Sequence, residues 1–285
     1  MQSLANSPAL FISVAGLFGL MVGSFLNVVI HRIPIMQQRE TDAWAKAIVN
    51  DTEPDLGEPY NLSVPASHCP SCESPVRPWQ NIPILSWLAL RGRCANCKTS
   101  ISIRYPLVEL VCGLLTMAVA WHFGYGLNAA GAIVLTWALL ALTMIDVDTQ
   151  TLPDVITLPW LWLGLLFSIF ASISDPVSSI IGAAAGYLSL WLLFHAFRLA
   201  TGKEGMGYGD FKLLALLGAW LGWQMLPIVI LIASLSGALV GLTLMATGIL
   251  HRGKPMPFGP ALAVAGWVAL MGGSALNNAY LSLFI

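Results

Sequence analysis

The chain has 285 residues, of which 57% are hydrophobic and only 9% are charged, with a net charge of −1 and a mean hydropathy of +0.76. A typical soluble domain is less apolar and carries about 25% charged residues. The composition therefore excludes an ordinary soluble domain and predicts a polytopic protein embedded in a lipid bilayer. We expect no nucleic-acid partner.

Eight apolar stretches predict an all-α fold with about eight transmembrane helices. A helix needs about 20 mostly apolar residues to cross the roughly 30 Å hydrocarbon layer. Seven stretches approach or reach this length: 9–31, 105–122, 129–145, 155–173, 177–197, 227–250 and 258–283. The eighth, 211–226, is short enough to be tilted or to begin inside the membrane.

The order of these stretches divides the chain into three expected parts. Residues 1–32 hold the first transmembrane helix, and residues 33–104 form a polar insert. Residues 105–285 form the main membrane domain. The first apolar stretch has no basic segment before it, so it is predicted to be a retained span and not a cleaved signal peptide.

The positive charges predict the orientation in the membrane. All 13 Lys and Arg residues fall on one side of the eight-helix path, and Arg252 and Lys254 lie in the last loop on that side. Short cytoplasmic loops carry the excess of Lys and Arg. We therefore expect the ends of the spans that carry Asp146 and Asp210 to face the cytoplasm.

The polar insert contains two Cys-x-x-Cys pairs, separated by 21 residues, which are Cys69, Cys72, Cys94 and Cys97. Four thiolates at close to this spacing form tetrahedral zinc sites. Two disulfides are the alternative, but thiols stay reduced in the cytoplasm. The sequence therefore predicts a zinc-binding cytoplasmic domain in which metal binding supplies much of the folding free energy. His68 adjoins Cys69 and is a further candidate ligand.

An acidic cluster closes the apolar stretch 129–145. Asp146 continues the apolar run directly, so it is the most membrane-embedded of the three acids here and the best catalytic candidate. Asp148 is expected to be a solvated loop acid. Asp154 follows Pro153 and is expected to cap the next helix.

A second acid, Asp210, ends the tetrapeptide Gly-Tyr-Gly-Asp directly before an apolar run. An ionisable group at mid-helix in a membrane costs about 2.5 to 3.5 kcal/mol, so its presence indicates function. Gly207 and Gly209 allow the backbone to turn and a substrate strand to pass close to Asp210. A plain loop with Asp210 as a helix cap is the simpler alternative.

Two carboxyl groups that share one proton hydrolyse a peptide bond without a covalent intermediate. The ionised member activates water, and the protonated member polarises the carbonyl. Asp146 and Asp210 are the candidate pair. The chain has no nucleotide-binding glycine motif and no His-Glu-x-x-His motif.

Several of these motifs together resemble those of the type IV prepilin peptidases. They are the Gly-Tyr-Gly-Asp-Phe-Lys segment 207–212, the Asp146 cluster with Leu-Pro-Asp at 152–154, the four cysteines, and Gly-Ser-Phe-Leu-Asn-Val-Val at 23–29. The similarity runs nearly from end to end. The four-cysteine insert is similar to that of the bifunctional bacterial members.

The resemblance implies a membrane aspartic endopeptidase in the bacterial inner membrane, with Asp146 and Asp210 catalytic. It implies cleavage of the basic leader from prepilins and type II secretion pseudopilins at the cytoplasmic face. Glu204 and the acids near 51–58 are placed to attract that leader. The resemblance alone implies methylation of the new N-terminal amine with S-adenosylmethionine, for which no residues are assigned.

Two other functions are compatible with acids in membrane helices. A proton-coupled transporter uses such acids for ion coupling, although it usually shows two related halves, and this chain has no convincing internal repeat. A non-catalytic protein of a secretion apparatus would use the zinc domain for docking. Cleavage of a leader-bearing pilin by the purified protein distinguishes these alternatives.

Overall fold

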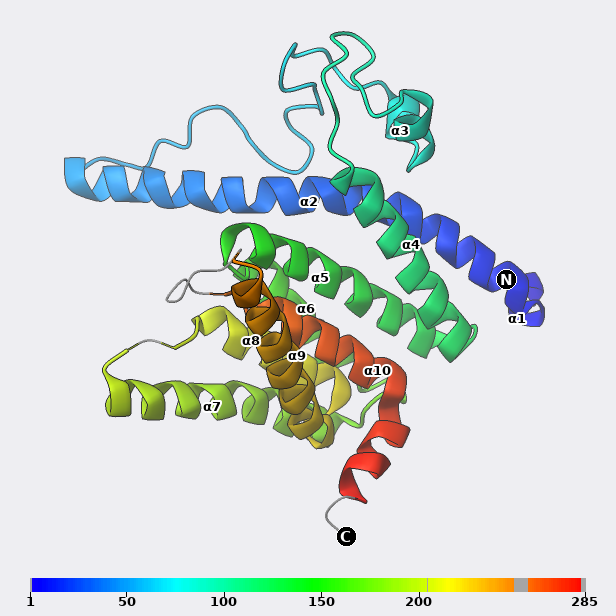
Figure 1. Ribbon diagram of the computed structural model, residues 1–285, viewed down its shortest axis with the longest axis vertical. Coiled ribbons are helices and arrows are strands. Elements are labelled where there is room, and N and C mark those ends of the chain that lie inside the picture. The colour runs from blue at the N-terminus through cyan, green and yellow to red at the C-terminus, as the bar shows by residue number, and fades with distance from the viewer. Residues whose placement is uncertain (1, 204, 249–255, 283–285) are drawn as a thin grey trace. The chain divides into compact units, whose positions relative to one another are not determined.

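The structure is a computed structural model that describes residues 2–203, 205–248 and 256–282 (Figure 1). Within these residues the regular elements are helices, and the only β-structure is two isolated bridges. Glu204, Arg252 and Lys254, which entered the sequence predictions, lie outside the described residues. The chain divides into two compact units, Met1–Tyr125 and Gly126–Ile285.

The first unit contains α1 (Gln2–Asn6), α2 (Pro8–Asn50), the 3₁₀ helix η1 (Pro78–Asn81), α3 (Leu85–Ala89) and α4 (Arg104–Phe123). The second unit contains α5 (Leu127–Thr149), α6 (Asp154–Phe167), α7 (Pro176–Thr201), α8 (Tyr208–Leu221), η2 (Trp223–Met225), α9 (Leu226–Ala246) and α10 (Gly259–Leu281). Each of the eight apolar stretches thus contributes residues to one of the helices.

Helix α2 is much longer than the first predicted span. It starts with Pro8, whose fixed φ suits a first helical turn, and continues through residue 32 to Asn50. Its 43 residues extend about 65 Å, twice the thickness of the hydrocarbon layer. The polar half of α2 therefore extends beyond the membrane and forms the start of the insert.

Helices α2 and α4 pack closely through small residues. A Cβ atom at Gly19 would lie 2.5 Å from Thr116 Oγ1, and one at Gly23 would lie 2.8 Å from the Cα atom of Glu109. Small residues allow such close approach of helix backbones in membranes. Asn27 adds a hydrogen bond from its Nδ2 to the backbone oxygen of Tyr105, 3.1 Å away.

The insert is attached to both helices by buried charged side chains. Arg32 of α2 donates from Nη1 to Asn61 O at 2.8 Å and from Nη2 to Pro65 O at 2.6 Å. Glu109 of α4 accepts a hydrogen bond from the backbone N–H of Ile84 at 2.7 Å. Hydrogen bonds to charged groups contribute about 1.5 to 3 kcal/mol each, so these contacts fix a segment with little regular structure.

Helix α8 forms the centre of the second unit and packs against α6, α7 and α10. Every residue from Leu213 to Leu221 is buried. Gly182 and Gly186 of α7 face the backbone of α8 at Gly218 and Leu214. With 14 residues, α8 is about 21 Å long, which is shorter than the roughly 30 Å hydrocarbon layer.

The all-helical membrane class is confirmed among the described residues. Five segments are long and apolar enough to cross a membrane: Pro8–Asn50, Arg104–Phe123, Leu127–Thr149, Pro176–Thr201 and Trp223–Ala246. Asp154–Phe167 and Gly259–Gly273 are shorter apolar helices. Gly273 interrupts α10 with a φ of 42°, a conformation that glycine adopts readily.

The glycine contact between α2 and α4 yields a prediction for stability. We expect Gly23→Ala to destabilise the protein by up to about 2 kcal/mol, because overpacking against the backbone of α4 costs up to about 3 kcal/mol and the gain in helix propensity offsets about 1 kcal/mol of it. Thermal denaturation in detergent measures this. Gly241→Ala is the control, since this glycine also lies inside a helix and its Cβ would make only ordinary contact, 3.5 Å from Met256 Sδ. A Gly23→Ala protein as stable as the wild type would contradict the close packing.

Candidate active site and metal centre

Asp146 lies at the C-terminal end of α5 and is buried, with 5% of its surface exposed. The helix ends three residues later, where Gln150 takes a left-handed conformation and donates its N–H to Asp146 O at 2.9 Å. Among the described residues, the carboxylate oxygen Oδ2 of Asp146 has no hydrogen-bond partner. A buried acceptor that lacks a partner is costly and is typical of a functional group.

Asp210 lies in the first turn of α8 and is 7% exposed. Gly207 precedes the helix in an extended conformation, and its oxygen accepts a hydrogen bond from the N–H of Asp210 at 3.3 Å. The carboxyl groups of Asp146 and Asp210 interact electrostatically. The fold therefore brings together two acids that are 64 positions apart in the sequence.

The two glycines of the motif have different surroundings. A Cβ atom at Gly209 would lie 2.9 Å from Leu152 Cβ, so this glycine lets the first turn of α8 pack against the loop between α5 and α6. A Cβ atom at Gly207 would meet only the Gly209 nitrogen, at 3.9 Å. The backbone at Gly207, with φ −84° and ψ 154°, is open to any residue. Among the described residues, no contact requires glycine at position 207.

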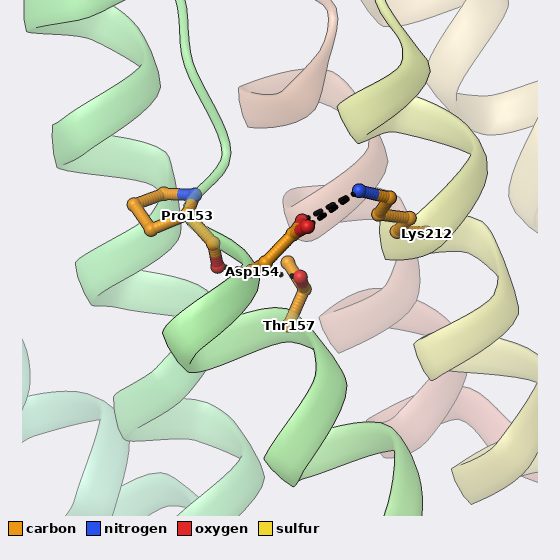
Figure 2. Close-up of polar contacts among 4 residues, drawn as sticks. All are labelled: Pro153, Asp154, Thr157 and Lys212. Carbon is orange, nitrogen blue, oxygen red and sulfur yellow. Dashed lines mark hydrogen bonds and ion pairs between the residues drawn. The ribbon is translucent and has the colours of Figure 1, made fainter. Parts of the chain in front are cut away.

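An ion pair joins the starts of α6 and α8 beside this site (Figure 2). Lys212 Nζ donates to both carboxylate oxygens of Asp154 at 2.7 Å each. Thr157, one turn further along α6, is fully buried and donates its hydroxyl to Pro153 O at 3.2 Å. The prediction that Asp154 caps α6 is wrong, because the capping position is Pro153 and the Asp154 side chain binds Lys212. Asp148 is exposed as expected, although it lies in the last turn of α5 and not in a loop.

Sequence analysis did not single out Gly259, which lies against Asp146. It starts α10, and a Cβ atom at this position would lie 2.5 Å from Asp146 Oδ2. The local signal is Phe258-Gly259-Pro260 at the start of an apolar run, and this pattern alone indicates only a helix start.

The four predicted cysteines form one cluster in the first unit. All four sulfur atoms lie within 4.8 Å of one another, and none forms a disulfide. Cys69 Sγ lies 3.7 Å from Cys97 Sγ, and Cys72 Sγ lies 4.0 Å from Cys94 Sγ. Sulfur atoms about 2.3 Å from a tetrahedral metal ion are about 3.8 Å apart, so the cluster fits a four-thiolate site.

The two Cys-x-x-Cys pairs have matching backbone geometry. The residue after each pair, Glu73 or Lys98, has a positive φ of 57° or 63°. The N–H of the first cysteine in each pair, Cys69 or Cys94, donates to a backbone oxygen five residues later, at 3.0 and 2.8 Å. This turn lets both cysteines of a pair point to one ion. His68 is not part of the cluster.

The thiol of Cys97 is prepared for metal binding. A hydrogen bond between its Sγ and the hydroxyl of Thr99, at 3.2 Å, together with the Thr99 backbone, lowers the pKa of Cys97 to about 6. The thiolate is the form that binds metal, so this residue offers a ligand at neutral pH. The four cysteines can hold a metal ion.

The fold and the paired buried acids define the class: a helical membrane protein with the two carboxyl groups that an aspartic peptidase needs. The chain matches the model of the bacterial peptidase A24 N-terminal domain over residues 17–123 and that of the type IV leader peptidase family over residues 133–242. The chain belongs to the type IV leader peptidase family.

Curated relatives cover nearly the whole chain. A prepilin leader peptidase/N-methyltransferase of Stutzerimonas stutzeri is 53% identical over 98% of this chain and 97% of its own. One of Aeromonas hydrophila is 54% identical over 98% of this chain and 96% of its own. One of Neisseria gonorrhoeae is 48% identical over 94% and 93%. No solved structure matches the chain.

The different surroundings of the two motif glycines predict different effects on stability. We expect Gly209→Ala to lower the free energy of unfolding by up to about 2 kcal/mol, because its Cβ would press on Leu152. Gly207→Ala has room and is expected to change it by no more than about 0.5 kcal/mol. Thermal denaturation in detergent compares the two. Equal losses in both variants would show that the contact with Leu152 is not what requires glycine.

Proposed function

We propose that this protein removes the leader peptide from type IV prepilins and type II secretion pseudopilins and then methylates the new N-terminal amine. The observation that carries the proposal is the meeting of Asp146 and Asp210 at helix ends inside an apolar protein. The chain is also about half identical to curated prepilin leader peptidase/N-methyltransferases over nearly their full length, which supports the same conclusion.

The two aspartates divide the chemistry of peptide hydrolysis. One carboxylate takes a proton from water, whose oxygen then attacks the scissile carbonyl carbon. The other, protonated carboxyl group donates a hydrogen bond to the carbonyl oxygen and stabilises the charge that develops there. A proton then passes to the leaving amine as the C–N bond breaks. Two adjacent carboxyl groups share a proton readily, since ionising both is costly.

Gly207 leaves room for the substrate backbone beside Asp210. No side chain of the described residues lies within 4 Å of a Cβ atom placed there. An extended substrate strand can pass this position without meeting a side chain, which suits a small residue before the cut. Gly209 serves the same site indirectly, by letting α8 pack on Leu152.

The membrane placement in this proposal uses all eight helices. The five long apolar helices together with α6, α8 and α10 make up the eight membrane helices. Helix α8 packs against α6, α7 and α10, which shelter it from lipid. The cation distribution supports a location of the catalytic helix ends at the cytoplasmic face of the bacterial inner membrane. Residues 105–285 then form the peptidase domain and 33–104 the metal domain, although the compact units divide at Tyr125 because α4 packs on α2.

Zinc is the metal we propose for the four cysteines. Four thiolates without an open position are typical of structural zinc and not of a catalytic ion. The insert has little regular structure, so the metal would be a main link between the turns of the two Cys-x-x-Cys pairs.

The methyltransferase activity uses S-adenosylmethionine as the methyl donor. When bound, this donor would supply a methyl group to the amine released by hydrolysis: the sulfur–methyl bond would break, S-adenosylhomocysteine would leave, and the nitrogen would lose a proton. This part of the proposal is supported by the names of the relatives, and no residue of the chain is assigned to the donor.

The acid pair is tested by single substitutions. We expect Asp146→Asn and Asp210→Asn each to reduce cleavage by about 10²- to 10⁴-fold or more, because an amide cannot exchange the proton. The assay incubates purified protein in detergent with a leader-bearing pilin and follows loss of the leader. Asp148→Asn is the matched control, since this acid is exposed and lies two residues after Asp146, and its effect on the rate should be milder.

Substantial cleavage by either Asn variant would remove that residue from the mechanism. Failure of the wild-type protein to cleave any prepilin would favour a transporter or an assembly protein, since both contain acids in membrane helices without peptidase activity.

The metal centre is tested by composition and by protection from proteolysis. We expect one zinc ion per chain, and Cys→Ser at position 69, 72, 94 or 97 should release it and expose the insert to protease. Cys112→Ala is the control, because this cysteine is buried in α4 outside the cluster. Full zinc content in the four Ser variants would place the metal elsewhere.

A further inference from the structure

The pairing with Asp210 does not explain the surroundings of one carboxylate oxygen of Asp146. Its Oδ2 is buried and, among the described residues, has no hydrogen-bond partner. The atoms beside it belong to the start of α10: a Cβ at Gly259 would lie 2.5 Å from Oδ2 and 3.1 Å from Cγ of Asp146. Real Cβ atoms essentially never come so near, so any other residue at position 259 would displace the carboxyl group.

The start of α10 suits a negative charge. The first N–H groups of a helix have no partner within the helix, and together they form its positive end. Pro260 follows Gly259 and has no N–H to donate. Within this first turn, Leu262 N–H donates a backbone hydrogen bond to Phe258 O at 3.1 Å. The backbone amide of Gly259 faces the Asp146 carboxyl group.

One side chain connects this helix start to the other catalytic helix. Leu152 lies against Gly209 at the start of α8, and its Cδ1 would lie 3.3 Å from a Cβ at Gly259. Leu152 is 9% exposed. The starts of α8 and α10 therefore pack on the same leucine, directly after the end of α5. Three helix ends that are far apart in the sequence surround the acid pair.

We propose that the start of α10 is the third wall of the catalytic centre and that Gly259 is a positioning residue for Asp146. The missing side chain lets the α10 backbone hold the carboxyl group in place while Oδ2 stays free to accept a proton from water. This inference rests on the proposed peptidase function. Gly259 acts through Asp146 and does not itself take part in bond making.

The first test is kinetic. Gly259→Ala should lower kcat by about 10- to 100-fold, because small displacements of a catalytic group have effects of this size, with KM and melting temperature nearly unchanged. Gly237→Ala is the matched control. Its Cβ would lie 3.6 Å from Ala261 Cβ and 3.7 Å from the Phe258 ring, which is ordinary contact with the same first turn of α10. It should retain the wild-type kcat.

The second test is geometric and does not require activity. The Asp146→Cys/Gly259→Cys double variant should form a disulfide under mild oxidation, since a Cβ at position 259 would lie 3.1 Å from Asp146 Cγ, the position that a cysteine sulfur would take. Linked peptides are detected by mass spectrometry. Asp146→Cys/Gly266→Cys is the control, because Gly266 lies two turns along α10 and faces Leu217. It should form no link.

The outcomes separate this inference from the function on which it rests. A normal kcat in Gly259→Ala, an equal loss in Gly237→Ala, a change confined to KM, or no cross-link between positions 146 and 259 would each overturn the positioning role, even in an active peptidase. If wild-type protein cleaves no prepilin but the cross-link forms, the peptidase proposal fails and only the placement of Gly259 beside Asp146 survives.

Discussion

Close contact of helix backbones at glycine positions is the interaction on which both units depend. Lipid tails are as apolar as the side chains they touch, so burial of apolar surface does little to associate helices within a bilayer. Association depends on packing, and packing is closest where no Cβ separates the backbones. Gly19 and Gly23 provide this contact between α2 and α4, and Gly182 and Gly186 provide it between α7 and α8.

The same close packing positions the candidate active site. Helix α8 is buried along its length by α6, α7 and α10, so its first turn and Asp210 are held by a rigid set of neighbours. Asp146 comes from a different helix at the point where α5 ends. Acids at helix ends are near loops that water and substrate can reach, whereas an acid at mid-helix would be surrounded by apolar side chains and lipid. Lys212, two residues after Asp210, forms its ion pair with Asp154.

In the first unit, the insert has little regular structure and needs other interactions to keep one conformation. Its four cysteines converge within 4.8 Å, while Arg32 and Glu109 fasten other parts of the segment to α2 and α4. Small domains bury too little apolar surface to be stable without such links. The cysteine cluster and the buried charged hydrogen bonds together take the place of a hydrophobic core in this segment.

Features that depend on neighbouring residues could be predicted from the amino-acid sequence. Composition and apolar length determined the all-helical membrane class, and the spacing within each Cys-x-x-Cys pair predicted the cluster, because the turn that brings two sulfurs together is local. Asp146 and Asp210 were identifiable because each interrupts or borders an apolar run. Their role as catalytic groups stays a prediction.

Contacts between residues that are far apart in the sequence became visible only in the folded structure. Nothing near Gly259 in the sequence indicates that it lies against Asp146, and nothing near Lys212 indicates that it binds Asp154. The prediction from sequence gave Gly207 and Gly209 the same role, whereas in the structure Gly209 packs closely on Leu152 and Gly207 has no such contact. Such contacts depend on how whole helices pack, and packing is set by the shapes of surfaces assembled from residues three and four positions apart on several helices at once.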